Sequence, residues 1–235
     1  MKVEIWSDIM CPFCYIGKRR FEAALEQFPG KDNITVEWKS FQLNPALKSQ
    51  PGKDIYDYVA EMKGQSREWS LAIHDQMAGT AKEAGLTYNF EKAVLANSFD
   101  AHRLIQLAKK HQLGDAAEEA LFHAYFTEGK DMSNHETLIA IGVEIGLDKT
   151  AVAAMLQSRD YAAAVNNDVE EAQQLGIRGV PFFVLDRKYG VSGAQPVEAF
   201  SQALDQAFAE WKKTQPVLEL DTLSGQVCTP DGECG

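Results

Sequence analysis

Two cysteines near the N-terminus, Cys11 and Cys14, are separated by only two residues and are the side chains best suited to chemistry. The stretch Val3–Trp6 just before them has the alternation of a half-buried strand. A helical pattern of apolar residues begins directly after them and continues to Phe28. Pro12 suits the first turn of such a helix, because its missing N–H would have no partner there in any case. A Cys-x-x-Cys at the junction of a strand and a helix is typical of a dithiol–disulfide redox centre.

Cys11 is expected to be the attacking thiol of this centre. It directly precedes the helix, where exposed backbone N–H groups and the positive end of the helix dipole stabilise a thiolate. Each unit by which the thiol pKa falls favours the thiolate by about 1.4 kcal/mol, and it also makes the disulfide a better oxidant. Cys14, one turn further on, is expected to resolve the mixed disulfide. Phe13 carries no charge and donates no strong hydrogen bond, so we expect a weaker oxidant than an enzyme with histidine there.

The predicted secondary structure places this pair in an α/β fold. The chain opens with strand, helix and strand within about 40 residues, which favours a right-handed parallel crossover. The predicted elements are strand 2–7, helix 11–28, strand 34–41, a helical stretch 54–174, strands 181–185 and 189–193, and a helix from 196. Without the helical stretch, a parallel strand pair and an antiparallel hairpin would share a four-stranded sheet. We therefore predict a thioredoxin fold with a large inserted all-helical domain.

The chain is accordingly divided into four predicted parts. Residues 1–50 form the N-terminal β-α-β part of the thioredoxin fold, 51–165 the inserted helical domain, and 166–213 the C-terminal α-β-β-α part. Residues 214–235 form an acidic tail that contains proline and glycine but no Lys or Arg. Within the insertion, Ala120–Phe126 is apolar nearly all round. The helix that carries it is therefore predicted to be central and buried.

A proline that opens a predicted strand soon after Gly176 is the second candidate feature. The thioredoxin fold carries a cis-proline loop at this position, and a cis peptide bond is a rare, specified feature. It would place Val180 and Pro181 against the Cys11 sulfur, keep metal away from it and offer the Val180 backbone to an extended substrate chain. The alternative is an ordinary proline at the start of a strand. Because proline and cysteine pair occur together in this strand order, we predict a thiol–disulfide exchange site.

Several segments resemble the DsbA-like oxidoreductases of the FrnE type, and the resemblance covers nearly the whole chain. The matching segments are Ser7–Phe21, Asn97–Leu104, Ala120–Phe126, Gly179–Val184 and Ser192–Pro196. The resemblance implies thiol–disulfide oxidoreductase or isomerase activity and a helical domain inserted in a thioredoxin fold. It also implies that Cys11 and Cys14 are the redox pair and that Pro181 is the cis-proline.

The 2-hydroxychromene-2-carboxylate isomerases and kappa-class glutathione transferases are similar to this chain outside the redox motif. They carry serine where this chain has Cys11 and use it to activate glutathione, so the two cysteines weigh against that chemistry. Asn97, Ser98 and His102 lie in the segment that faces the active site in those relatives. The alternative for His102 is a capping or packing role between helices. A glutathione-dependent isomerase or transferase is thus the second hypothesis. No cofactor is predicted, and glutathione is a candidate redox partner only.

Cys228 and Cys234 form a second cysteine pair in the acidic tail. FrnE-type proteins resemble this chain in having a second pair near the C-terminus, and an intramolecular disulfide relay with Cys11 and Cys14 is one hypothesis. An extended chain spans up to ~3.6 Å per residue, so the tail is long enough to return to Cys11. The alternatives are two bystander thiols and a zinc site made of four thiols. Structural zinc prefers spacings of about two to four residues in both arms, so no metal site is predicted.

Composition argues against several kinds of partner. Of 235 residues, 45% are apolar, and the net charge is −11 from 23 Lys and Arg against 34 Asp and Glu. Nucleic acids and anionic membranes require clustered Lys and Arg, and no apolar run approaches the roughly 20 residues of a membrane span. The N-terminus shows no signal-peptide pattern and the cysteines are too few for a disulfide scaffold, so we expect a cytoplasmic protein. Expected partners are proteins or small molecules with thiols or disulfides. The sequence leaves monomer and homodimer open.

Overall fold

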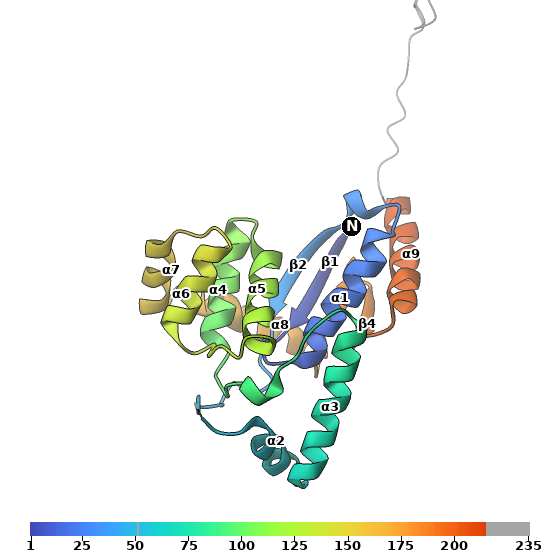
Figure 1. Cartoon of the computed structure of the whole chain (residues 1–235). Helices are drawn as coiled ribbons and strands as arrows, with labels where there is room; N and C mark the ends of the chain where they lie inside the picture. The colour runs from blue at the N-terminus through green and yellow to red at the C-terminus, as the bar shows by residue number, and fades with distance from the viewer. Residues whose placement is uncertain (51, 215–235) are drawn as a thin grey trace, which may run out of the picture.

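A four-stranded mixed sheet lies at the centre of the computed structural model, which describes residues 1–50 and 52–214 (Figure 1). Its strands are β1 (Lys2–Ser7), β2 (Thr35–Ser40), β3 (Phe182–Leu185) and β4 (Tyr189–Ser192), in the spatial order β2-β1-β3-β4. β1 runs parallel to β2, with Val3 opposite Val36, and antiparallel to β3, with Ile5 opposite Phe183. β3 and β4 form an antiparallel hairpin. The predicted thioredoxin fold is confirmed.

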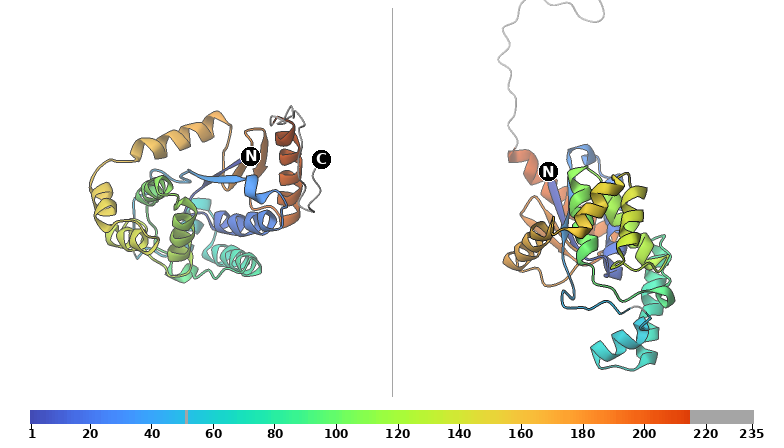
Figure 2. Two further views of the ribbon diagram at one scale, coloured as in Figure 1. Left: turned by 90° about the horizontal axis from the view of Figure 1, so that it is seen from above. Right: turned by 90° about the vertical axis from the view of Figure 1, so that its left-hand side faces the viewer.

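Helices cover both faces of this sheet. α1 (Pro12–Glu26) and α9 (Val197–Thr214) lie on one face, and α8 (Ala162–Gln174) lies on the other, as Figure 2 shows from above. Successive side chains of a strand point to opposite faces. Val3 and Ile5 therefore join the core with α1 and α9, whereas Trp6 packs against α8. β1 is buried on both faces and paired with β2 and β3 on its two edges, and its carboxyl end leads directly into the cysteine pair.

Between β2 and α8 the described residues form six α-helices. They are α2 (Ile55–Lys63), α3 (Arg67–Glu83), α4 (Phe99–Lys110), α5 (Gly114–Phe126), α6 (His135–Glu144) and α7 (Lys149–Gln157). One short 3-10 helix, Phe90–Lys92, lies between α3 and α4, and another, Lys31–Asn33, lies before β2. Leu121 and Phe122 of α5 are fully buried, which confirms its predicted central place. In Figure 1, α2 and α3 project beyond the end of the sheet where α1 begins. No helix in this part of the chain, or elsewhere in 1–50 and 52–214, is long and apolar enough to cross a membrane.

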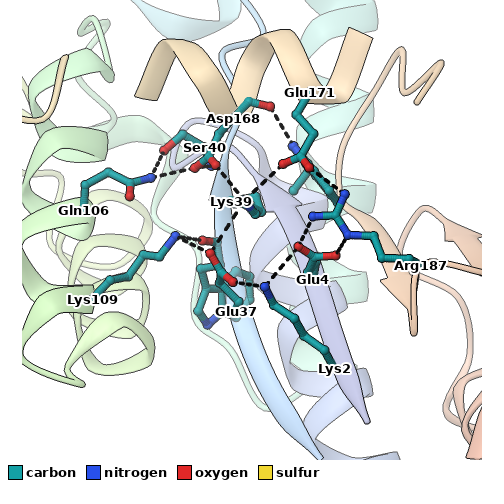
Figure 3. A network of polar contacts seen from close by, with 12 residues as sticks. Lys2, Glu4, Glu37, Lys39, Ser40, Gln106, Lys109, Asp168, Glu171 and Arg187 are labelled. Carbon is teal, nitrogen blue, oxygen red and sulfur yellow. Dashed lines mark hydrogen bonds and ion pairs between the residues drawn. The ribbon is translucent and has the colours of Figure 1, made fainter. Parts of the chain in front are cut away.

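A buried polar network joins the sheet to α4 and α8 on the second face (Figure 3). The Asp168 carboxylate of α8 accepts from the Ser40 N–H at 3.0 Å and from the Gln106 side-chain amide at 2.6 Å. Lys39 forms an ion pair with the same carboxylate at 3.0 Å. Gln106 also donates to the Ser40 hydroxyl at 3.0 Å. The Asp168 carboxylate thus connects α8 of the thioredoxin frame with the end of β2 and with α4 of the insertion.

Candidate active site

The two cysteines lie where β1 ends and α1 begins. Cys11 is the N-cap residue of α1 with extended backbone (φ −93°, ψ 112°), and Pro12 is the first residue of the helix. The Cys14 N–H donates to the Cys11 carbonyl at 3.0 Å, and the Cys11 N–H donates to the Asp8 carbonyl at 2.9 Å. Within the described residues both sulfurs are free thiols. Cys11 therefore stands at the N-terminus of α1, the positive end of the helix dipole.

The loop before β3 packs against the first cysteine. The Val180–Pro181 peptide bond is cis. The Cys11 thiol donates to the Val180 carbonyl, with 3.4 Å between Sγ and oxygen. Pro181 is buried and Val180 is half-buried. The cysteine pair and the Val180–Pro181 loop, far apart in sequence, thus form a single site.

The two thiols differ in their surroundings. Cys11 is 4% exposed and Cys14 only 1%. Burial, followed by the hydrogen bond from Cys11 and its charge, raises the pKa of the Cys14 thiol well above its usual range. The backbone N–H of Asp8 opposes this increase without cancelling it. Cys14 therefore holds its proton, which suits a resolving thiol and not an attacking one.

Gly17 of α1 allows the cis-proline loop to approach the helix closely. A Cβ atom at this position would lie 2.9 Å from Cγ of Pro181 and 3.4 Å from the Phe183 ring. A contact of 2.9 Å is too short for two carbon atoms, and a proline ring cannot rotate away as a flexible side chain would. A side chain at position 17 would therefore push Pro181 away from the cysteines.

The Gly17→Ala variant is expected to lose about 1–3 kcal/mol of unfolding free energy through overpacking. The displaced loop should also slow thiol–disulfide exchange several-fold. Gly79 is the matched control, because it lies on the exposed face of α3 and a Cβ there has nothing within 4 Å. Gly79→Ala should leave exchange unchanged. Urea unfolding and exchange rates of both variants check the prediction, and equal behaviour would contradict it.

Asp8 organises the turn that leads into Cys11, a role not found from the sequence. Its carboxylate is 1% exposed and accepts from the Met10 N–H at 3.2 Å and from the Leu43 N–H at 2.7 Å. Its backbone carbonyl accepts from Cys11, as described above. The Ser-Asp pair before the motif was visible in the sequence, but the partner loop at Leu43 was not. Asp8 thus fixes the turn before the cysteines to the segment after β2.

Tyr88 connects the helical insertion to the cysteine motif. Its hydroxyl donates to the Pro12 carbonyl at 2.6 Å. Its ring stacks on Phe126 with 4.5 Å between centroids and lies 6.3 Å from the ring of Tyr15. Burial and then the charges of the Cys11 and Cys14 sulfurs raise the pKa of Tyr88 above its usual range. Tyr88 is therefore a neutral donor close to both sulfurs, and no sequence motif indicated it.

The structure places Asn97 and His102 beside the site but engages both side chains in structural contacts. Asn97 donates to the Leu47 carbonyl at 2.9 Å and accepts from the Phe99 N–H at 2.9 Å, so it holds a loop. His102 is fully buried, and its Nε2 lies 3.4 Å from an oxygen of Asp8. Its Nδ1 has no hydrogen-bonding partner among the described residues. These contacts match the packing alternative for His102. Its buried ring contacts Asp8 and so supports the turn that leads into Cys11.

The remaining candidate residues divide into two groups. Phe13 is 43% exposed at the surface of the site, and Pro12 is half-buried beneath it. Cys228 and Cys234 lie outside the described residues.

Among the residues that are described, no group of three or more His, Cys, Asp and Glu side chains is placed to hold a metal ion. A hollow of about 730 Å³ between α5 and α6 includes neither Cys11 nor Cys14 among its lining residues. Cys11, Cys14 and the Val180–Pro181 loop therefore remain the candidate site.

Comparison with known families assigns this arrangement to a class. Residues 2–205 match the DSBA-like thioredoxin domain. The match covers well over half of the 235 residues. The chain therefore belongs to the family of DSBA-like thioredoxin domains. This family of oxidoreductases combines a thioredoxin fold with many helices, as observed here.

Individual relatives agree with this assignment. The uncharacterised protein YwbO of Bacillus subtilis is 28% identical over 204 residues, which cover 86% of this chain and 94% of that protein. The crystal structure of the probable DsbA oxidoreductase SCO1869 from Streptomyces coelicolor is 41% identical, has a TM-score of 0.85, and matches 100% of this chain and 98% of its own. The cytosolic disulfide reductase DsbM from Pseudomonas aeruginosa, solved with GSH, is 18% identical with a TM-score of 0.63 over 89% of this chain and 100% of its own. The last comparison shows a shared fold alone.

Proposed function

We propose that this protein is a thiol–disulfide oxidoreductase or isomerase that uses Cys11 and Cys14 as its redox dithiol. The contact of 3.4 Å between the Cys11 thiol and the Val180 carbonyl carries the proposal. The Cys11 sulfur lies at the N-terminus of α1 and beside a backbone edge that can receive an extended substrate. The FrnE-type segments support a finer assignment to that group of DsbA-like oxidoreductases.

The proposed reaction proceeds through a mixed disulfide. The Cys11 thiolate attacks one sulfur of a substrate disulfide, and the other substrate sulfur leaves as a thiolate that takes up a proton. Cys14 then loses its proton and attacks the Cys11 sulfur, which releases the second substrate thiol. The enzyme dithiol loses two electrons and becomes a disulfide, and the substrate disulfide gains them and is reduced to two thiols. In reverse, the same steps oxidise a substrate dithiol.

Single serine variants test this proposal. Cys11→Ser should abolish reduction of insulin and reactivation of scrambled ribonuclease, because no attacking sulfur is left. Cys14→Ser should accumulate mixed disulfides between Cys11 and substrate, because the resolving step is blocked. Mass spectrometry of the trapped adducts identifies the linked cysteine. Full activity of Cys11→Ser would refute the proposal.

The second hypothesis, a glutathione-dependent isomerase or transferase, makes a different prediction. It requires tight glutathione binding and turnover that is unaffected by the loss of Cys14. The observed contacts favour the first hypothesis, because Asn97 and His102 bond to the protein's own Leu47 and Asp8. Their side chains are therefore engaged before any ligand arrives.

We further propose that Cys228 and Cys234 exchange disulfides with the Cys11–Cys14 pair. This proposal rests on the sequence pattern of the tail alone. We place the exchange in the cytoplasm, with thiol- or disulfide-bearing proteins and small molecules as partners, as the cysteine usage favours. A redox titration, with the paired cysteines mapped by mass spectrometry, should show that the two pairs equilibrate with each other. Independent titration of the two pairs would contradict a relay.

A further inference from the structure

The hollow between α5 and α6, of about 730 Å³, has no part in the proposed exchange chemistry. α4 packs against both of these helices, and yet none of the described residues that line the hollow belongs to α4. The chain turns back after α5, over residues 127–134, and α6 runs in the opposite direction (Figure 1). The hollow is therefore a groove along two antiparallel helices, on the side that α4 does not fill.

Small apolar side chains line the middle of this groove. Ala116, Ala120 and Ala124 follow one another at intervals of four residues on α5, and Ala140 and Ile145 line the groove at α6. Positions four residues apart lie on one face of a helix. Ala124 is buried, whereas Ala116 and Ala140 are exposed. Alanine leaves room for the axis of a further helix to approach to about 8–10 Å, so the groove has the shape to receive a helix.

Carboxylates lie at both ends of the groove. Glu128 and Glu136 lie at the connection between the two helices, and Glu119 and Glu144 lie toward the opposite ends of α5 and α6. Lys130 is the one lysine or arginine among the described residues that line the groove. Glu136 and Glu144 belong to the same helix and are about 12 Å apart at 1.5 Å per residue. The groove thus combines an apolar middle with negative charge at each end.

Two of these carboxylates lie where they do not stabilise their own helices. Glu144 is the last residue of α6, and Glu128 directly follows the C-cap residue of α5. The C-terminal end of a helix carries a partial negative charge, which favours a nearby cation and not a carboxylate. The ion pairs of the described residues include Glu119 and Glu128 but neither Glu136 nor Glu144. A cation supplied by a partner would compensate the charge of these groups.

Neither a second copy of the chain nor its own tail matches this charge. A two-fold interface centred on the groove would place the same surface on both sides, so carboxylates would face carboxylates. Residues 214–235 contain acidic side chains but no Lys or Arg. The charge of the groove therefore favours a different protein with basic side chains.

We propose that this groove binds a basic amphipathic helix of a partner protein. The apolar face of that helix would lie on the alanine and isoleucine side chains, and Lys or Arg near both ends of the face would meet the glutamates. Cations about seven or eight residues apart on the partner span the same distance as Glu136 and Glu144. The partner helix would pack on α5 and α6 as in a helical bundle. This surface lies apart from the cysteines, so the inference goes beyond the proposed exchange and does not depend on it.

Two peptides without cysteine test the inference. Both have the same alanine, leucine and lysine composition and a length of about 18 residues, which is about five helical turns. In the first peptide the leucines form one face with lysines at its ends, and in the second the order is scrambled so that no face is apolar. Fluorescence anisotropy with the full-length protein should show that the first peptide binds about ten-fold more tightly. Added salt should weaken this binding, because exposed charges are screened.

Charge reversal in the groove should weaken binding of the amphipathic peptide. The double variant Glu136→Lys, Glu144→Lys is expected to raise its Kd about ten-fold. The double variant Glu170→Lys, Glu198→Lys is the matched control, because it changes the net charge equally at exposed glutamates that do not line the groove. The control should bind the peptide like the wild type. Circular dichroism checks that each variant is folded.

A bulky side chain in the groove provides a second, uncharged test. Ala140→Trp should block the peptide, whereas Ala163→Trp, at an exposed position of α8, should not. Equal binding of the two peptides, or equal losses in the groove variants and their controls, would overturn the inference. Cys11→Ser should bind the peptide like the wild type. Loss of binding in this variant would also overturn the inference, because the peptide would then bind at the exchange site.

Discussion

Replacement of Lys18 by methionine is expected to lower the unfolding free energy by about 3 kcal/mol. The Lys18 side chain is 2% exposed, and its ammonium group lies 3.2 Å from carboxylate oxygens of both Asp115 and Glu119. Burial alone would lower its pKa, but the charge of Asp115 and the contact with Glu22 outweigh burial and raise it. Without the cation, these carboxylates face each other in a partly dehydrated space. Asp115 and Glu119 are in contact with solvent. The loss of unfolding free energy is therefore expected at the lower end of the range that is typical when one partner of a buried ion pair is removed.

Urea unfolding at neutral pH measures this loss. Lys31→Met is the matched control, because Lys31 forms an ion pair with Glu26 at 2.7 Å on the surface. Exposed pairs of this kind contribute little to stability, so the control should unfold at the wild-type urea concentration. Equal midpoints for Lys18→Met and the wild type would contradict the role assigned to the buried cation.

Glu118 should make the protein less stable as the pH rises. Its side chain is 1% exposed, and Oε2 has no hydrogen-bonding partner among the described residues. Burial raises its pKa from 4.5 to about 8, and the charge of Lys18 limits the increase. Between these values the folded state holds a proton that the unfolded chain has released. The stability from this proton is complete below about pH 4.5 and is lost as the pH rises through about 8.

The expected loss is on the order of 1 kcal/mol per pH unit between pH 6 and 8. Glu118→Gln carries no titrating proton, so its unfolding free energy should change much less over this interval and should exceed that of the wild type at pH 9. Urea midpoints at pH 6, 7, 8 and 9 for both proteins test this directly. Parallel pH profiles would show that another group causes the dependence.

The two variants should also be coupled. Lys18 lies near enough to Glu118 for its charge to lower the pKa of that carboxyl. In Lys18→Met, the Glu118 pKa should therefore rise further and the pH-dependent loss should move to higher pH. Neighbouring groups that share an electrostatic network are not additive, and a double-mutant cycle measures the difference. If the effects of the two substitutions on the unfolding free energy are additive at pH 8, the two residues do not interact.

The sequence predicted the parts of the fold that depend on local periodicity. β1 was predicted at 2–7 and observed at Lys2–Ser7, and the hairpin strands predicted at 181–185 and 189–193 correspond to β3 and β4. The first helix ends at Glu26 and not at Phe28, because Phe28 leaves the helix to pack edge-on against Phe208. That contact joins distant parts of the chain, so no local pattern contains it.

The site was predictable only where a motif or strand order indicated it. Cys11, Cys14 and Pro181 have distinctive residue types at distinctive positions, so local reasoning could select them. Asp8 and Tyr88 act through contacts with Leu43 and Pro12, at sequence separations of 35 and 76 residues. Long-range pairs of this kind are fixed by packing and leave no periodic signal. The same holds for Gly17, whose role depends on the approach of Pro181.

The hydrogen bond from Tyr88 to Pro12 has a consequence for how the molecule opens. Tyr88 belongs to the helical insertion, whereas Pro12 begins the helix of the thioredoxin frame. One continuous core of buried side chains includes both cysteines, Tyr88 and the helices α4 and α5. Subglobal unfolding of the insertion would expose the cysteines and remove the donor that restrains their helix. Amide protons of α1 and α5 should consequently exchange as one cooperative unit, and the insertion cannot be deleted as a separate module.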